Sequence, residues 1–195
     1  MDDIEQQDNT PHVETFTDSD GKVIKRISML NGVPHGETQI FDADGKIAQQ
    51  VTYENGILSG EAKFYLNGEL IMSTNFKDGL QEGEAVFFTN TVKSGMVTMK
   101  KGLFDGIFTS YYASGQVLRE ASYVAGKLHG KCDLYYPDGA LLETSTYKDN
   151  QLDGEVVKYF QDGAIMQISM FQDGKGIGYI DTYDNKGNLV SSKEA

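Results

Sequence analysis

Apolar and polar residues alternate along most of the chain, in short runs that end at glycine-rich turns. In one such run, Leu141, Glu143, Ser145 and Tyr147 would point to one side and the residues between them to the other. A period of two is typical of a β-strand, because successive side chains of a strand alternate between its faces. The Asp-Gly pair just before this run favours a tight turn, since glycine adopts the positive φ that such turns need. The pattern therefore predicts a β-hairpin.

The same hairpin pattern recurs along the chain with a period of 23 or 24 residues. Each repeat is closed by a glycine: Gly36, Gly60, Gly83, Gly106, Gly130, Gly154 and Gly178. Five residues after each of these glycines lies an aromatic ring: Phe41, Tyr65, Phe88, Tyr111, Tyr135, Tyr159 and Tyr183. A hairpin-turn glycine then follows in six repeats: Gly45, Gly68, Gly115, Gly139, Gly163 and Gly187. A fixed period of this length indicates a repeat architecture.

We therefore expect an all-β fold, an elongated single-sheet array of antiparallel β-hairpins in which each hairpin packs on its neighbours. The aromatic rings are expected to pack between neighbouring hairpins. The array is predicted over residues 13–190, as about seven repeats preceded by a partial one. Residues 1–12 contain acids but no Lys or Arg, so we expect an acidic, disordered arm there. Residues 191–195 are expected to form a tail.

Three positions, in two of the repeats, depart from the repeat pattern. Asn150 stands where the other repeats have a turn glycine, and Asn tolerates a left-handed backbone best after glycine. Thr91 and Lys93 stand where the third repeat should have its hairpin-turn glycine and its branched aliphatic residue. A β-branched threonine resists positive φ, so residues 90–95 are predicted to form a different turn. That turn is either a tolerated loop variant or a specialised contact loop.

The repeat combines Gly-x-x-x-x-Tyr/Phe, Asp-Gly-x-Leu and Tyr-x-x-Gly-x-x-x-Gly, and this pattern resembles MORN repeats. It is more similar to the bacterial MORN-variant repeats, which occur in proteins commonly labelled as antitoxins of toxin–antitoxin systems. The resemblance covers about residues 13–190 and implies a row of β-hairpins in one antiparallel sheet. The antitoxin label implies that the protein binds a toxic partner protein.

The chain is acidic, with 29 Asp and Glu residues, 17 Lys and Arg residues and a net charge of −12. Nucleic acids and anionic lipids both require basic patches, so we expect neither as a partner. A basic protein partner is favoured, because long-range attraction steers opposite charges together. The acidic start lacks the features of a secretory signal, no apolar run reaches membrane-spanning length, and Cys132 is the single cysteine. These features predict a cytoplasmic location.

Catalytic, metal and cofactor sites are not expected. The histidines lie far apart along the array: His12, His35 and His129. Residues 18–21 and 42–45 faintly resemble the start of a calcium loop, but they lack its later glycine and closing glutamate. Residues 174–178 resemble a phosphate-binding loop without the helix that such a loop opens onto. We therefore expect a protein that is not an enzyme and has no cofactor.

Acidic residues recur directly after the repeat-closing glycines, and they are the candidate partner-binding residues: Glu37, Glu61, Glu84 and Glu155. Equivalent positions in successive hairpins lie two strands apart, about 9.6 Å. Such carboxylates would attract a basic partner, although solubility and protection of sheet edges also explain them. We expect an antitoxin or immunity protein that neutralises a basic toxin or effector by direct binding. The alternatives are a scaffold or assembly module and a MORN-type lipid-surface binder, and the oligomeric state stays open.

Overall fold

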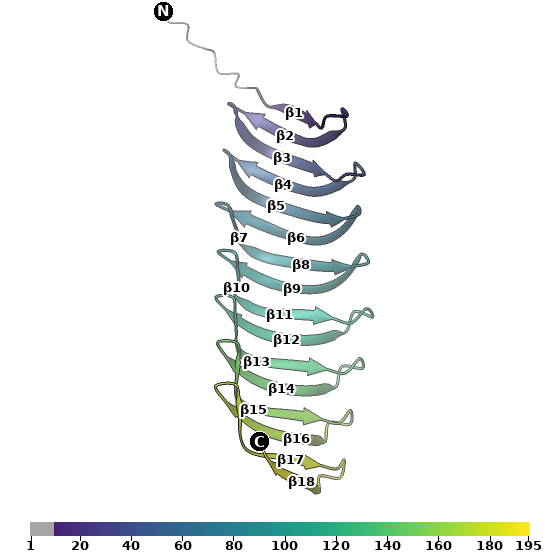
Figure 1. Ribbon diagram of the computed structural model, residues 1–195, viewed down its shortest axis with the longest axis vertical. Helices are drawn as coiled ribbons and strands as arrows, with labels where there is room; N and C mark the ends of the chain where they lie inside the picture. The colour runs from purple at the N-terminus through teal and green to yellow at the C-terminus, as the bar shows by residue number, and fades with distance from the viewer. Residues whose placement is uncertain (1–9) are drawn as a thin grey trace, which may run out of the picture. The chain divides into compact units, whose positions relative to one another are not determined.

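The computed structural model describes residues 10–195, which form 18 β-strands and no helix (Figure 1). The chain divides into two compact units, residues 1–91 and 92–195. The strands of the first unit are β1 (His12–Thr17), β2 (Val23–Leu30), β3 (Val33–Phe41), β4 (Ile47–Glu54), β5 (Ile57–Leu66), β6 (Glu69–Lys77), β7 (Leu80–Gln81) and β8 (Gly83–Thr89). Those of the second are β9 (Val92–Lys100), β10 (Leu103–Phe104), β11 (Gly106–Tyr111), β12 (Val117–Val124), β13 (Lys127–Tyr135), β14 (Leu141–Lys148), β15 (Gln151–Tyr159), β16 (Ile165–Gln172), β17 (Lys175–Tyr183) and β18 (Leu189–Glu194).

Within each unit, strands that follow one another in the sequence pair antiparallel, as Figure 1 shows. β7 and β8 both pair with β6, because the hairpin arm that they form is interrupted once. In the same way, β10 and β11 form one interrupted arm, and both pair with β9. The all-β fold of antiparallel hairpins predicted from the sequence is therefore confirmed. Residues 10–195 contain no helix with the length and apolarity that a membrane span requires.

The division into residues 1–12, 13–190 and 191–195 stays a prediction. Residues 1–9 of the expected arm lie outside the described residues, and the first strand begins at His12.

Two kinds of turn alternate along each sheet. At one end of the hairpins, two-residue turns have positive φ at both positions, as at Asn55–Gly56 and Asp149–Asn150. This pairing matches the right-handed twist of the flanking strands. At the other end most turns span five residues, as in Tyr136–Ala140, where the Gly139 N–H donates to the Tyr136 carbonyl at 2.9 Å. Asn150 has a φ of 72°, so the left-handed backbone predicted for this position is confirmed.

The expectation of a different turn at residues 90–95 is wrong. Asn90 and Thr91 form a two-residue turn between β8 and β9, with φ of 50° and 64°. The turn at Asn67–Gly68 joins its strands in the same way, with φ of 54° and 87°. The threonine therefore adopts the left-handed conformation that its branched side chain disfavours.

In each unit, one face of the strands carries a row of small buried side chains, which we call the core row. In the first unit Thr38 lies opposite Val51, and Ala62 lies opposite Thr74. Residues paired in this way point to the same face of a sheet. The members of the core row are all buried: Thr38, Val51, Ala62, Thr74, Ala85, Val97, Ala121, Cys132, Ser145, Val156 and Ser169.

Larger side chains cover the core row from its sides. In the second unit Tyr123 and Tyr147 pack against the buried cluster of Ala121, Leu128 and Cys132. Earlier in the same unit, the rings of Phe104 and Phe108 stack with their centroids 5.9 Å apart. The Tyr123 ring meets the Phe104 ring edge-on, with a centroid distance of 5.4 Å. A sheet without a second layer thus buries a core by flanking small residues with aromatic rings.

The opposite face, which we call the ring face, carries the aromatic residues that follow the repeat-closing glycines. All seven rings are half-buried rather than fully buried. Several of their hydroxyl groups contact the preceding hairpin: the Tyr65 hydroxyl lies 3.3 Å from the Gln50 side-chain oxygen, and the Tyr135 hydroxyl lies 3.2 Å from the Glu120 carboxylate. The rings therefore connect neighbouring hairpins while leaving part of their surface accessible.

Candidate partner-binding surface

The candidate glutamates all lie exposed on the ring face, because each one precedes a core-row residue on its strand. Glu37, Glu61 and Glu84 occupy the same position in successive hairpins of the first unit, on β3, β5 and β8. They form a column of carboxylates with a spacing of about 9–10 Å. We call these three residues the acidic column.

The acidic column does not continue into the second unit. Glu155 on β15 is the single acid there in this repeat position, which is otherwise occupied by Ile107, Lys131 and Tyr179. Ile107 and Tyr179 are 58% and 64% exposed, so this part of the ring face is largely apolar. Three of the four predicted residues therefore lie in successive hairpins of the first unit. Glu155 lies in the second unit, and its neighbouring repeats there have no acid at this position.

Neighbouring side chains orient the acidic column. The Glu37 carboxylate accepts hydrogen bonds from the amide groups of Gln39 at 2.8 Å and Gln50 at 2.6 Å. Glu61 forms an ion pair with Lys63 at 3.0 Å, and this hydrogen bond raises the pKa of the Lys63 ammonium. Two hydrogen bonds thus fix the orientation of Glu37, whereas the ammonium group of Lys63 offsets part of the Glu61 charge.

A second feature of the ring face is a series of notches at the five-residue-turn end of the hairpins. Each notch lies between the turn of one hairpin and the ring of the next. The first unit contains a notch of about 450 Å³ lined by Lys46, Ile47, Tyr65, Asn67 and Gly68. In the second unit, notches of about 320 and 470 Å³ have Tyr135 and Tyr183 as their rings. The repeat therefore builds a similar cavity several times, with different side chains in it.

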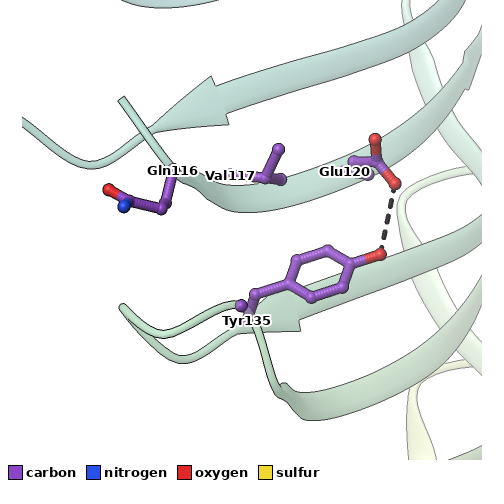
Figure 2. A pocket seen from close by; sticks show the side chains of 5 residues that line it. Gln116, Val117, Glu120 and Tyr135 are labelled. Carbon is purple, nitrogen blue, oxygen red and sulfur yellow. Dashed lines mark hydrogen bonds between the residues drawn. The ribbon is translucent and has the colours of Figure 1, made fainter. Parts of the chain in front are cut away.

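The notch at Tyr135 combines an apolar wall with a carboxylate (Figure 2). Gln116, Val117, Glu120 and Gly139 complete its lining. Figure 2 shows the Tyr135 ring lying below Val117, with its hydroxyl directed to Glu120. Burial raises the pKa of Tyr135 to about 12, and the charges of Glu120 and Asp133 add to this effect. The phenol therefore stays neutral at physiological pH and donates to the carboxylate.

The residue that meets the ring hydroxyl differs between equivalent notches. Gln50 takes the place of Glu120 beside Tyr65, and Met96 takes it beside Tyr111, with its sulfur 3.2 Å from the hydroxyl. In the notch of Tyr183 this position is held by Ile168. The shared geometry thus presents an amide, a thioether, a carboxylate or an alkyl group.

Behind the Tyr135 notch, Asp133 lies directly opposite Glu120 across the β12–β13 pair. Asp133 is buried, accepts a hydrogen bond from the Thr144 hydroxyl at 2.7 Å and pairs with Lys131 at 2.7 Å. Within residues 10–195, no ion pair involves Glu120. Two carboxylates thus face each other, and the one Lys close to them is bound to Asp133.

The remaining candidate chemistry is structural. The Asn55 N–H donates to His35 Nδ1 at 3.4 Å, and His129 lies 4.0 Å from Asp149 beside a turn. Cys132 is buried in the core row and accepts a hydrogen bond from the Arg119 guanidinium at 3.1 Å. The part of the chain that the structure describes holds no cluster of three or more His, Cys, Asp or Glu side chains suited to a metal ion.

Sequence reasoning identified the exposed glutamates but missed the notches. The ring and the residue that it meets are separated by 15 positions in each case, and neither position is unusual on its own. Comparing residues 15 positions before each ring would have revealed that Glu120 is the one carboxylate at this position, where the other repeats have Arg26 or neutral side chains.

The comparisons with known proteins support the repeat assignment. Residues 34–55, 104–125 and 128–149 match the family model described as MORN repeat variant, so these three segments resemble MORN repeats. No curated protein matches the chain. Among solved structures, a porin-like protein from Bacteroides uniformis is 13% identical over 92% of this chain and 86% of that one, with a TM-score of 0.24. A TM-score this low carries no argument.

Proposed function

We propose that this MORN-repeat protein is a non-catalytic binding protein that holds a basic protein partner on the ring face of its first unit. The acidic column of Glu37, Glu61 and Glu84 carries this proposal. These residues are exposed, share one face and recur at the hairpin spacing. Repeat arrays commonly bind partners on such extended surfaces.

The distribution of charge supports a basic partner. Residues 10–91 carry 12 Asp and Glu residues and 6 Lys and Arg residues, whereas residues 92–195 carry 13 and 11. The field of the first unit is therefore strongly negative, and it would speed the encounter with a positive surface. The same field would repel nucleic acids and anionic lipids.

In its narrower form, the proposal is that this protein is a cytoplasmic antitoxin or immunity protein. The bound partner would then be a toxin whose basic active surface is covered by the ring face. The resemblance of the repeats to those of proteins labelled as antitoxins motivates this form. A scaffold that assembles harmless partners is the alternative, and the growth experiment below separates the two.

The first prediction tests the acidic column by reversing its charge. Wild-type protein, Glu61→Lys/Glu84→Lys and the control Glu155→Lys are used to capture proteins from a lysate of the source cells. We expect the wild type and the control to retain the same basic protein, and the double variant to lose it. The on-rate of that protein should fall at least tenfold between low and physiological salt, because the charges are exposed to screening.

A partner retained equally by the double variant, or a salt-independent on-rate, would refute binding through the acidic column. The captured protein is then expressed alone and together with this chain. Growth arrest that this chain relieves supports the antitoxin form, and normal growth supports the scaffold. Circular dichroism of each variant checks that folding is unchanged, since exposed charges contribute little to stability.

A further inference from the structure

The Tyr135 notch differs from its equivalents in carrying an unpaired carboxylate, and we propose that it receives an arginine side chain of a protein partner. This inference rests on the proposed function for the existence of a partner. It does not depend on the acidic column, because the notch lies in the second unit. The inference concerns the kind of partner side chain that the second unit recognises.

The dimensions of the notch suit a single long side chain. Its volume of about 320 Å³ lies at the small end of ligand cavities, which span roughly 300–1,000 Å³. Val117 and the ring of Tyr135 provide the apolar wall that an alkyl stem would contact, and Glu120 lies beyond the ring hydroxyl (Figure 2). A side chain with an apolar stem and a cationic head matches this order of surfaces.

The negative charge of the notch favours binding of a cation. Glu120 and Asp133 are directly opposed on β12 and β13, and like charges in this arrangement destabilise a sheet. Lys131 and Thr144 compensate Asp133, whereas Glu120 receives only the neutral hydroxyl of Tyr135. An arrangement that costs stability and is offset only in part, by the Tyr135 hydroxyl and the charge of Lys131, is typical of a functional site.

The aromatic wall favours arginine over lysine. A guanidinium group is planar and stacks on an aromatic face, while its N–H groups point in the plane toward a carboxylate. The Tyr135 ring and the Glu120 carboxylate offer these two surfaces side by side. Gln116 lines the opposite end of the notch from Glu120 (Figure 2).

The equivalent notches provide an internal comparison. In the notch of Tyr65, Lys46 and Gln50 replace Gln116 and Glu120, which makes that notch neutral to positive. The notch of Tyr183 has Ala164 and Ile168 at the same two positions. Of these three notches, the one at Tyr135 alone presents a negative charge beside its ring.

The second prediction is tested on the full chain by NMR, with Nα-acetyl-arginine methylamide as the probe. We expect saturable shifts of the Val117, Tyr135 and Gly139 amides, with millimolar affinity because the probe is small. The corresponding citrulline derivative has the same shape without charge and should shift these amides at least fivefold less. The lysine derivative should bind at least twofold more weakly than arginine.

Two variants complete the test. Glu120→Gln keeps the acceptor for Tyr135 but removes the charge, and should weaken arginine binding at least fivefold. Lys46→Gln/Gln50→Glu copies the charged notch into the first unit and should create a second site that shifts the Tyr65 amide. Equal shifts from arginine and citrulline, unchanged binding by Glu120→Gln, or a preference for lysine would overturn the inference. None of these measurements involves a partner protein, so their failure leaves partner binding by the acidic column standing.

Discussion

At the scale of single residues, the turn at Thr91 shows where hairpin geometry overrides residue preference. A non-glycine residue in the left-handed region costs about 1–2 kcal/mol, and more when the side chain is branched. Thr91 adopts a φ of 64° in a two-residue turn, at the position that Gly68 occupies in the equivalent turn of the preceding repeat. This position is therefore strained, and the strain is local to the backbone.

The third prediction is that Thr91→Gly stabilises the protein by about 1 kcal/mol, despite the extra chain entropy that glycine loses on folding. The midpoint of urea unfolding measures the change. Thr89→Gly is the matched control, because Thr89 ends β8 without a positive φ. It should destabilise by about 0.5–1 kcal/mol. A loss of stability in Thr91→Gly as large as in the control would show that Thr91 is not strained.

The sequence predicted most turn positions at this scale but could not predict Thr91. Asn150 and the turn glycines follow residue preference, so their conformations could be read from residue type. The backbone of Thr91 has a positive φ that its residue type disfavours, so residue type does not reveal it. The exposure of the glutamates followed from strand alternation, whereas the Tyr135 notch depends on two strands meeting in space.

At the scale of hairpins, polar side chains link several turns at the five-residue-turn end to the next hairpin. The Tyr112 hydroxyl donates to the Tyr135 carbonyl at 2.7 Å, and the Tyr136 hydroxyl donates to the Tyr159 carbonyl at 3.0 Å. In the next hairpin this position is Phe160, which lacks the hydroxyl. The first unit uses lysines instead, as when the Lys46 ammonium donates to the Asn67 carbonyl at 3.0 Å and the Lys22 ammonium to the Ala43 carbonyl.

The fourth prediction exchanges these hydroxyl groups. Tyr112→Phe and Tyr136→Phe should each destabilise by about 0.5–1.5 kcal/mol, the net contribution of one hydrogen bond. Phe160→Tyr is the matched reverse change and should stabilise by a similar amount by reaching the Tyr183 carbonyl. Urea unfolding of the three variants checks both signs. Variants that all lie within 0.3 kcal/mol of the wild type would show that the links contribute nothing to stability.

The period of the repeat predicted the hairpins, but it did not predict these links. Tyr112, Tyr136 and Phe160 all read as aromatic residues next to a turn, and the sequence does not reveal which hydroxyl groups meet a carbonyl. The acceptor belongs to the backbone of another hairpin, so it becomes visible only once the hairpins are stacked.

At the scale of the whole molecule, charge distinguishes the two units more than fold does. Both are antiparallel sheets of the same repeat. The first unit has twice as many acids as bases among its described residues, while the second is close to balance. Repulsion between like charges destabilises a compact state, and salt screens this repulsion. The two units should therefore respond differently to ionic strength.

The fifth prediction is that salt protects the first unit more than the second. Amide hydrogen exchange is followed on the full chain at about 0.02 M and about 0.5 M NaCl, where screening lengths differ severalfold. We expect exchange in β3–β6 to slow several times more than in β13–β16, because opening of the more acidic unit relieves more repulsion. Sucrose at matched osmolarity is the control, since it strengthens folding without screening charge and should slow both units alike. An equal or larger effect of salt on the second unit would contradict the charge argument and weaken the case that the first unit steers a basic partner.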